Sequence, residues 1–186
     1  MQIVITIVII ILVSLSVISF GGIIFEDDSI RNFSGFFYKY GFRVYKKIIP
    51  VGDFNILPVE KHVITKDEGV FHFTDEGIIY FRSSESKFRM FRFRTPLAFK
   101  AMGSIKDVSS IEITARLPLF FSILSISWIL LGIILSTLFG MAALFFALFP
   151  LGMFLISYPV EKNRMEKMVT ELKKIFAEHS QRPVNF

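Results

Sequence analysis

The sequence contains no cysteine. This absence excludes disulfide bonds, cysteine nucleophiles and cysteine-ligated zinc sites. Glycine-rich phosphate loops and nucleophile-elbow motifs are absent as well. The three histidines are far apart in the chain and lack the spacing of a metal-binding pair; they are His62, His72 and His179. His72 falls within a predicted strand, where we expect an ordinary strand residue.

The acidic residues give little indication of catalysis. The pairs Asp67-Glu68 and Asp75-Glu76 each precede a glycine. Such positions are typical of turns and do not require a paired general acid and base. We therefore expect no enzymatic activity, no catalytic residue, no metal site and no cofactor.

Charged residues are missing from two long stretches. The run from Leu117 to Val160 is charge-free and is about twice the ~20 apolar residues that cross a bilayer as one helix. Gly140, with Ser136 and Thr137 just before it, supplies a turn near its middle, so we predict a hairpin of transmembrane helices over 117–137 and 140–158. The charge-free run from Ile3 to Phe25 predicts another transmembrane helix over 1–25.

The first of these helices could instead be a secretory signal. However, Met1-Gln2 carries no basic residue, the apolar run is long, and Ser19 to Gly22 matches a cleavage site poorly. We expect an uncleaved membrane anchor.

Basic residues predict the orientation. They cluster after the first span, just before the hairpin and after its second helix, and the hairpin turn has none. Since Lys and Arg favour the cytoplasmic side, three spans place the N-terminus outside and both the middle domain and the C-terminus in the cytoplasm. We expect the cell (inner) membrane, with the net charge of +5 facing anionic lipids and not nucleic acid.

A juxtamembrane amphipathic segment is predicted over 26–50. Within it, Ser29 to Lys47 has helical periodicity, with one aromatic face formed by Phe33, Phe36, Phe37, Tyr40 and Val44. Such a helix suits the headgroup layer, and the same face could equally pack on the middle domain.

The segment 51–116 predicts a small β-rich domain. Alternation around Phe71 and Phe73, a turn at Asp75-Glu76-Gly77, and further strand patterns over 78–82, 88–94 and 110–115 indicate a β-meander. The stretch from Pro96 to Gly103 fits no strand.

The tail over 159–186 is predicted to be a helix after Pro159. One face is apolar and the other is mainly charged; the apolar residues are Met165, Met168, Val169, Leu172, Ile175 and Phe176. This amphipathic helix could lie on the membrane, dock on the middle domain or pair with a partner helix.

Basic side chains supply the candidate contact sites. Arg92 and Arg94 share one face of the strand predicted over 88–94, with Arg89 nearby, and Lys46 and Lys47 follow the first span. Paired guanidinium groups beside a membrane can bind lipid phosphates or an acidic partner. The alternative is a solvated outer sheet face.

The runs from Phe71 to Tyr80 and from Ser104 to Ile113 resemble those of bacterial membrane proteins with a pleckstrin-homology-like domain. The shared pattern is a strand, an acidic turn ending in glycine and a second strand, followed by an Asp-Val step into another strand. The resemblance implies a small β-barrel capped by a helix, which serves as a scaffold for lipid or protein contacts and carries no catalytic residues.

The predicted fold class is therefore a membrane α+β protein with three transmembrane helices. We expect a non-enzymatic role in binding a membrane-protein partner, as an accessory or regulatory subunit or as an immunity-type protein. The alternatives are a homo-oligomeric pore or transporter subunit and a lipid-binding module. Spans without ionisable residues argue against a transport route.

Overall fold

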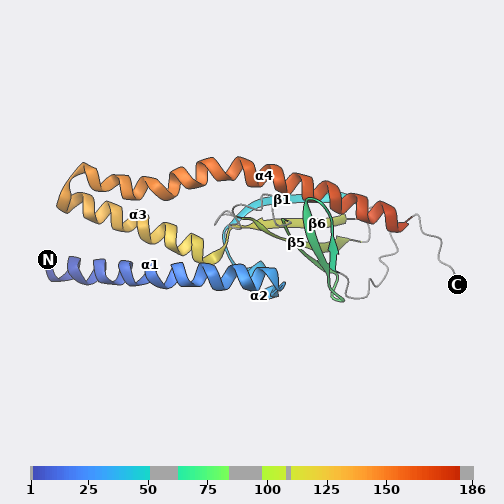
Figure 1. The fold of residues 1–186 in the computed structure, drawn as a ribbon, viewed down its shortest axis with the longest axis horizontal. Helices are drawn as coiled ribbons and strands as arrows, with labels where there is room; N and C mark the ends of the chain where they lie inside the picture. The colour runs from blue at the N-terminus through green and yellow to red at the C-terminus, as the bar shows by residue number, and fades with distance from the viewer. Residues whose placement is uncertain (1, 51–62, 84–97, 108–109, 181–186) are drawn as a thin grey trace.

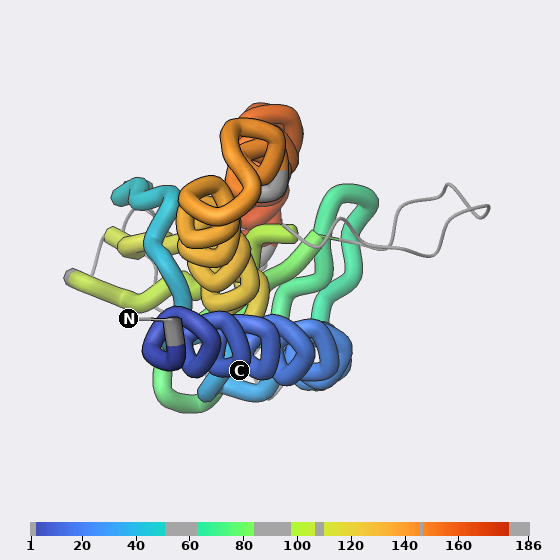
Figure 2. Tube along the Cα trace, turned by 90° about the vertical axis from the view of Figure 1, so that its left-hand side faces the viewer, coloured from blue at the N-terminus to red at the C-terminus, as the bar shows by residue number. Residues whose placement is uncertain are grey.

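Three long helices lie at one end of the molecule and a β-sheet lies at the other (Figure 1). The computed structural model describes residues 2–50, 63–83, 98–107 and 110–180. The long helices are α1 (Gln2–Arg31), α3 (Leu119–Phe139) and α4 (Leu144–Ser180). Viewed along the long axis, α3 lies between α1 and α4 (Figure 2), and it packs against both.

All three helices are long and apolar enough to cross a bilayer. Their most apolar windows have mean hydropathies of 3.1 in α1, 2.4 in α3 and 2.0 in α4. Most side chains in these windows face outward, as expected where the solvent is hydrocarbon. The structure thus agrees with the three spans expected from the sequence.

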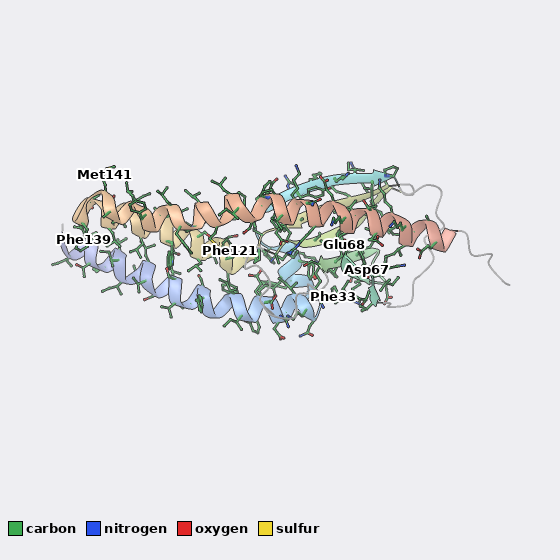
Figure 3. All side chains as sticks on the ribbon, turned by 45° about the horizontal axis from the view of Figure 1, so that its top comes forward. Phe33, Asp67, Glu68, Phe121, Phe139 and Met141 are labelled. Carbon is green, nitrogen blue, oxygen red and sulfur yellow. The ribbon has the colours of Figure 1, made fainter. Side chains whose placement is uncertain are left out.

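The turn between α3 and α4 lies where it was predicted. Gly140 has φ +75°, and its N–H donates to the carbonyl of Ser136 at 3.0 Å. A short 3₁₀ turn, η1 (Met141–Ala143), then leads into α4. Phe139 and Met141 lie at the tip, at the end of the molecule opposite the sheet (Figure 3).

The sheet has six antiparallel strands in the order β1-β6-β5-β4-β3-β2. Their bounds are β1 Arg43–Pro50, β2 Val63–Thr65, β3 Gly69–Phe73, β4 Ile78–Ser83, β5 Lys100–Asp107 and β6 Ser110–Arg116. Strands β2 to β6 form a meander, and β1 returns to pair with β6. β1 and β2 are therefore the outer strands of the described sheet.

The strands on either side of Gly77 and the strand before α3 confirm the predicted meander. The interval from Pro96 to Gly103 does not: β5 begins at Lys100, so the expectation of no strand there is wrong. Lys100 and Gly103 hide the strand pattern, because a lysine is rarely buried and a glycine lacks a side chain. The strand predicted over 88–94 lies outside the described residues.

The helix predicted over Ser29 to Lys47 is also wrong. α1 ends at Arg31, α2 is the short helix Gly35–Lys39, and the chain is already in β1 at Arg43. Phe33 has φ +54° and Gly41 has φ +117°, so the chain turns on both sides of α2. An ideal Cβ on Gly41 would meet the carbonyl oxygen of Leu117, which explains why only glycine fits there.

Helix α4 covers one face of the sheet with the apolar stripe predicted for the tail. Met165, Met168, Leu172 and Ile175 are at most 2% exposed and pack with sheet residues that include Phe71 and Phe81. Docking on the middle domain is therefore the correct alternative of the three. Pro159 does not begin a new helix, because α4 continues through both Pro150 and Pro159.

The opposite face of the sheet is partly covered by α2 and the end of α1. Tyr38 is 1% exposed, and its ring lies 4.8 Å from that of Tyr80 in a tilted arrangement. Its hydroxyl donates to the carbonyl of Ile30. Phe36 and Tyr40 of the same short helix are exposed. The aromatic residues near α2 are thus divided between core and surface.

Candidate functional site at the junction of helices and sheet

Two buried glutamates mark the place where the long helices meet the sheet. Glu26 near the end of α1 is 1% exposed, and Glu161 in α4 is 2% exposed. Both contact the beginning of β5, which starts at Lys100. We call Glu26, Lys100 and Glu161 the junction cluster.

Glu26 and Lys100 form a buried ion pair. The Lys100 ammonium lies 2.5 Å from Oε1 of Glu26, and the two side chains are 0% and 1% exposed. Burial lowers the pKa of Lys100, and nearby Arg116 acts in the same direction, while the hydrogen bond to Glu26 opposes them. A buried ammonium requires such a partner, because an isolated charge in the interior costs several kcal/mol.

The same carboxylate also holds the first turn of α3. Backbone N–H groups of Leu119 and Phe120 donate to Glu26 at 2.7 Å and 2.9 Å. These groups have no partner within α3, and the N-terminal end of a helix favours a negative charge. One side chain of α1 therefore fixes both the start of α3 and the start of β5.

Glu161 makes the corresponding contact from α4. Its Oε2 accepts the backbone N–H of Phe99 at 3.4 Å, and its Oε1 lies 2.7 Å from Arg164. Glu161 follows the last apolar turn of the α4 span and precedes the stripe that covers the sheet. The junction cluster thus ties both outer helices to the start of β5, α1 at Lys100 and α4 at Phe99 just before the strand.

Four basic residues lie side by side across the end of the sheet nearest the long helices. The strand register pairs Arg82 with Lys100, Lys100 with Arg116, and Arg116 with Arg43. Directly paired residues on antiparallel strands project from the same face. We call these four residues the basic row; within it Lys100 is paired with Glu26 and Arg82 lies over the Phe33 ring at 5.4 Å.

The predicted contact residues are not brought together in the described structure. Lys46 and Lys47 are exposed on β1, and Lys46 pairs with Glu112 of β6 at 2.9 Å. Their alternation along the strand places them on opposite faces of the sheet. Arg89, Arg92 and Arg94 lie outside the described residues.

The histidines and acidic pairs take ordinary structural positions where they are described. His72 lies in β3 with its ring 5.0 Å from that of Phe33. Asp67 and Glu68 form the β2–β3 turn beside the last turns of α4 (Figure 3), where Glu68 faces Lys167 at 3.6 Å. Among the described residues, no three His, Cys, Asp or Glu side chains come together as metal ligands.

The junction cluster was not predicted from the sequence. In the sequence, Glu26 is an acidic residue directly after a span, on the side where the other flanking residues are mainly basic. This departure from the basic bias was the available signal. Nothing around Lys100 in the sequence indicates burial. Only the fold brings these residues together, since they are 74 positions apart.

The fold and the junction cluster define an α+β protein with three helices long and apolar enough to be membrane spans, attached to a six-stranded antiparallel sheet. Comparison with protein families, with curated proteins and with solved structures found no match.

Proposed function

We propose that this protein is a non-enzymatic integral membrane protein that binds another membrane protein through its outer strand β1. The observation that carries the proposal is the exposure of β1. This strand is eight residues long and, within the described residues, pairs with β6 alone. A long outer strand presents backbone N–H and C=O groups that can accept a strand from another chain.

The side chains of β1 support a protein partner. Ile48 is 48% exposed, and it directly follows the exposed residues Lys46 and Lys47. An exposed apolar side chain among cations suits a partner strand that carries apolar and acidic residues. Lys46 and Lys47 are therefore kept as contact residues.

The attachment of the sheet to the helices supports an accessory or regulatory role. α4 is one continuous helix from the hairpin turn to the far side of the sheet, and Glu26 bonds both to Lys100 and to the start of α3. A displacement of the sheet on partner binding at β1 would therefore also displace the candidate spans. A regulatory subunit and an immunity-type protein would both use this arrangement.

The proposal includes orientation and fold type. The sheet would face the cytoplasm at the inner membrane, because the basic residues flank the spans on that side. A helix packed across an antiparallel sheet is also what a pleckstrin-homology-like domain would require. That assignment extends the proposed binding role and adds no catalytic one.

Site-specific photocrosslinking in the native membrane tests the function. A photoreactive residue at Lys47 or Ile48 should give one crosslinked membrane protein, identified by mass spectrometry. Thr65 on the opposite outer strand and Lys173 on α4 are exposed control positions and should not give it. The charge reversal Lys47→Glu should reduce the amount of crosslinked product that forms from a photoreactive residue at position 48.

Two outcomes would contradict the proposal. Equal crosslinking at Thr65, Lys173 and β1 would show a lack of specificity. A product containing only this chain would indicate a homo-oligomer in place of a separate partner.

A further inference from the structure

Aromatic side chains remain exposed where the chain leaves the first long helix and enters the sheet. Helix α2 lies beside the end of α1 at this junction (Figure 1) and buries Phe37 and Tyr38. The aromatic residues left exposed are Phe36 at 57%, Tyr40 at 51% and Phe42 at 58%. The ring centroids of Phe36 and Tyr40 are 4.6 Å apart, so these two rings form one surface. We call Phe36, Tyr40 and Phe42 the aromatic patch.

The length of α3 indicates where the hydrocarbon core of a bilayer would end. α3 has 21 residues, which at about 1.5 Å per residue make a helix roughly 31 Å long. This length matches the ~30 Å thickness of the hydrocarbon core. As a membrane span, α3 therefore places one hydrocarbon boundary near Leu119. Because Glu26 accepts the N–H of Leu119, the same boundary crosses α1 near Glu26.

Helix α2 packs at the level of this boundary. The ring of Phe37 lies 5.8 Å from that of Phe25 in α1 and 6.5 Å from that of Phe120 in α3. Phe25 directly precedes Glu26, and Phe120 directly follows the first residue of α3. Phe25 is itself 63% exposed, so the aromatic patch continues the apolar outer surface of α1.

The chain in α2 runs from the sheet back toward the candidate spans. Gly35 at its start lies against the hydroxyl of Tyr80 in β4. Gly41, just after its end, lies against the carbonyl of Leu117, two residues before α3. Arg116 fixes this turn by donating from Nη1 to the carbonyl of Gly41 at 3.1 Å. The end of α2 is therefore nearer to the spans than its start.

Phe42 reaches furthest along the spans. Its side chain lines an apolar pocket between α3 and α4 together with Phe121 and Ser125. The N–H of Leu117 donates to the carbonyl of Phe42 at 2.9 Å, which fixes this position. Phe121 and Ser125 are two and six residues beyond Leu119. The ring of Phe42 therefore lies roughly 3–9 Å inside the boundary, among residues of a candidate span.

The composition around the aromatic patch suits the boundary between hydrocarbon and headgroups. Residues 32–52 contain no Asp or Glu, and their basic residues are Lys39, Arg43, Lys46 and Lys47. Lys39 and Arg43 are exposed and each directly adjoins a residue of the patch. Aromatic rings at the edge of the hydrocarbon, with cations that reach the headgroups, are typical of segments that lie in a membrane interface.

We infer that the aromatic patch inserts into the boundary of the bilayer and anchors the sheet to the membrane surface. The partner is the lipid surface itself. Phe42 lies among the acyl chains, and Phe36 and Tyr40 lie at the level where the acyl chains meet the headgroups. Lys39 and Arg43 extend toward the lipid phosphates.

This anchor also determines the height of β1 above the membrane. β1 begins at Arg43, directly after the patch, so its first residues lie at the membrane surface. The inference rests on the proposed membrane location of the long helices. It requires neither Lys47 nor Ile48, so failure of the partner proposed for β1 would leave it intact.

Nitroxide labels measure the depth of the patch directly. Because the chain has no cysteine, single substitutions label one position each; they are Phe36→Cys, Tyr40→Cys and Phe42→Cys. The labelled full chain would be reconstituted in vesicles of phosphatidylcholine and phosphatidylglycerol. Electron paramagnetic resonance then compares the accessibility of each label to oxygen, which concentrates in hydrocarbon, with its accessibility to a water-soluble nickel chelate.

Two further labels serve as references. Leu130→Cys is at an exposed position of α3, eleven residues beyond Leu119, and should lie about 16 Å inside the boundary. Ile105→Cys is the matched apolar control, since Ile105 is 36% exposed. It lies five residues along β5 from Lys100, about 17 Å beyond the junction, and should be fully accessible to the nickel chelate.

The label at Phe42 should lie roughly 3–9 Å inside the boundary, followed by Tyr40 and then Phe36 close to the boundary itself. Patch labels as accessible to nickel as the label at Ile105, with Leu130 deep, would overturn the inference alone. Low accessibility of the patch to both reagents would show that protein covers it and would also overturn the inference. A label at Leu130 that is open to nickel would instead contradict the proposed membrane location, and the anchor with it.

Discussion

The Lys100 ammonium lies 2.5 Å from a carboxylate oxygen of Glu26, at a point where neither side chain is more than 1% exposed. Glu26 belongs to the first candidate span and Lys100 to the fourth strand of the β2–β6 meander. The same carboxylate accepts two N–H groups from α3. One acidic residue therefore fixes the relative position of two candidate spans and the sheet.

Replacing Glu26 by Gln should destabilise the protein by about 3–5 kcal/mol, because it leaves the Lys100 ammonium buried without a counter-charge. The glutamine oxygen can still accept one of the α3 N–H groups, so the loss reports mainly on the ion pair. Chemical denaturation in detergent micelles, followed by circular dichroism, measures the change.

Two further variants isolate the buried charge. Adding Lys100→Met to Glu26→Gln should restore most of the lost stability, since the charge itself is then removed. Asp27→Asn, one residue along α1, breaks an exposed pair with Arg31 and should cost much less. Equal losses for Glu26→Gln and Asp27→Asn would show that the pair contributes nothing special.

The docking of α4 on the sheet is open to a direct packing test. Leu172 is 0% exposed in the core between α4 and the sheet. Leu172→Ala should lower the free energy of unfolding by about 2–5 kcal/mol, because it removes buried methyl groups and leaves a cavity. Lys173→Ala, on the exposed side of the same turn, should change it by less than about 0.5 kcal/mol. A Leu172→Ala protein as stable as the parent would mean that α4 does not pack there in solution.

Glu112 should titrate below its ordinary range. A hydrogen bond from Lys46 lowers its pKa from the usual 4.5, and the more distant charges of Lys106 and Arg43 act in the same direction. Because the pKa is lower in the folded chain, the stabilisation is complete above about pH 4.5 and is lost as the pH falls through the folded value.

Carboxyl NMR titration of the detergent-solubilised chain measures this pKa. Lys46→Gln should raise the pKa of Glu112 most, Lys106→Gln less, and Arg43→Gln least, in the order of their effects. A pKa unchanged in Lys46→Gln would place the lysine elsewhere on the exposed strand. The experiment thus also locates one of the proposed partner-contact residues.

The elements that could be predicted from the sequence are those whose own residues determine them. A charge-free run long enough to cross a bilayer leaves little choice but helix, and Gly140 supplies the turn. The stripe of α4 and the hairpin around Gly77 are equally local patterns. Their bounds are less well predicted, because α1 continues beyond residue 25 to Arg31 and α4 joins the last span and the tail into one helix.

The elements that were missed depend on contacts between distant residues. Residues 43–47 were predicted to end the helix with the aromatic face, yet they form β1 because β6 offers a strand to pair with and Gly41 turns the chain toward it. β5 contains a buried lysine that is tolerated only because Glu26 meets it. Local pattern alone cannot anticipate a partner that is contributed by another part of the chain.

The close approach of α3 and α4 gives the last prediction. Gly132 faces Ala147, and an ideal Cβ on Gly132 would lie 2.7 Å from the backbone nitrogen of Ala147. Because a backbone atom cannot move aside as a side chain can, Gly132→Ala should force the helices apart and cost about 1–3 kcal/mol. Gly152→Ala is the matched control, since a Cβ there meets nothing within 4 Å. Thermal unfolding in micelles should show a lower midpoint for Gly132→Ala alone, and equal midpoints would show that small residues do not set the spacing of this hairpin.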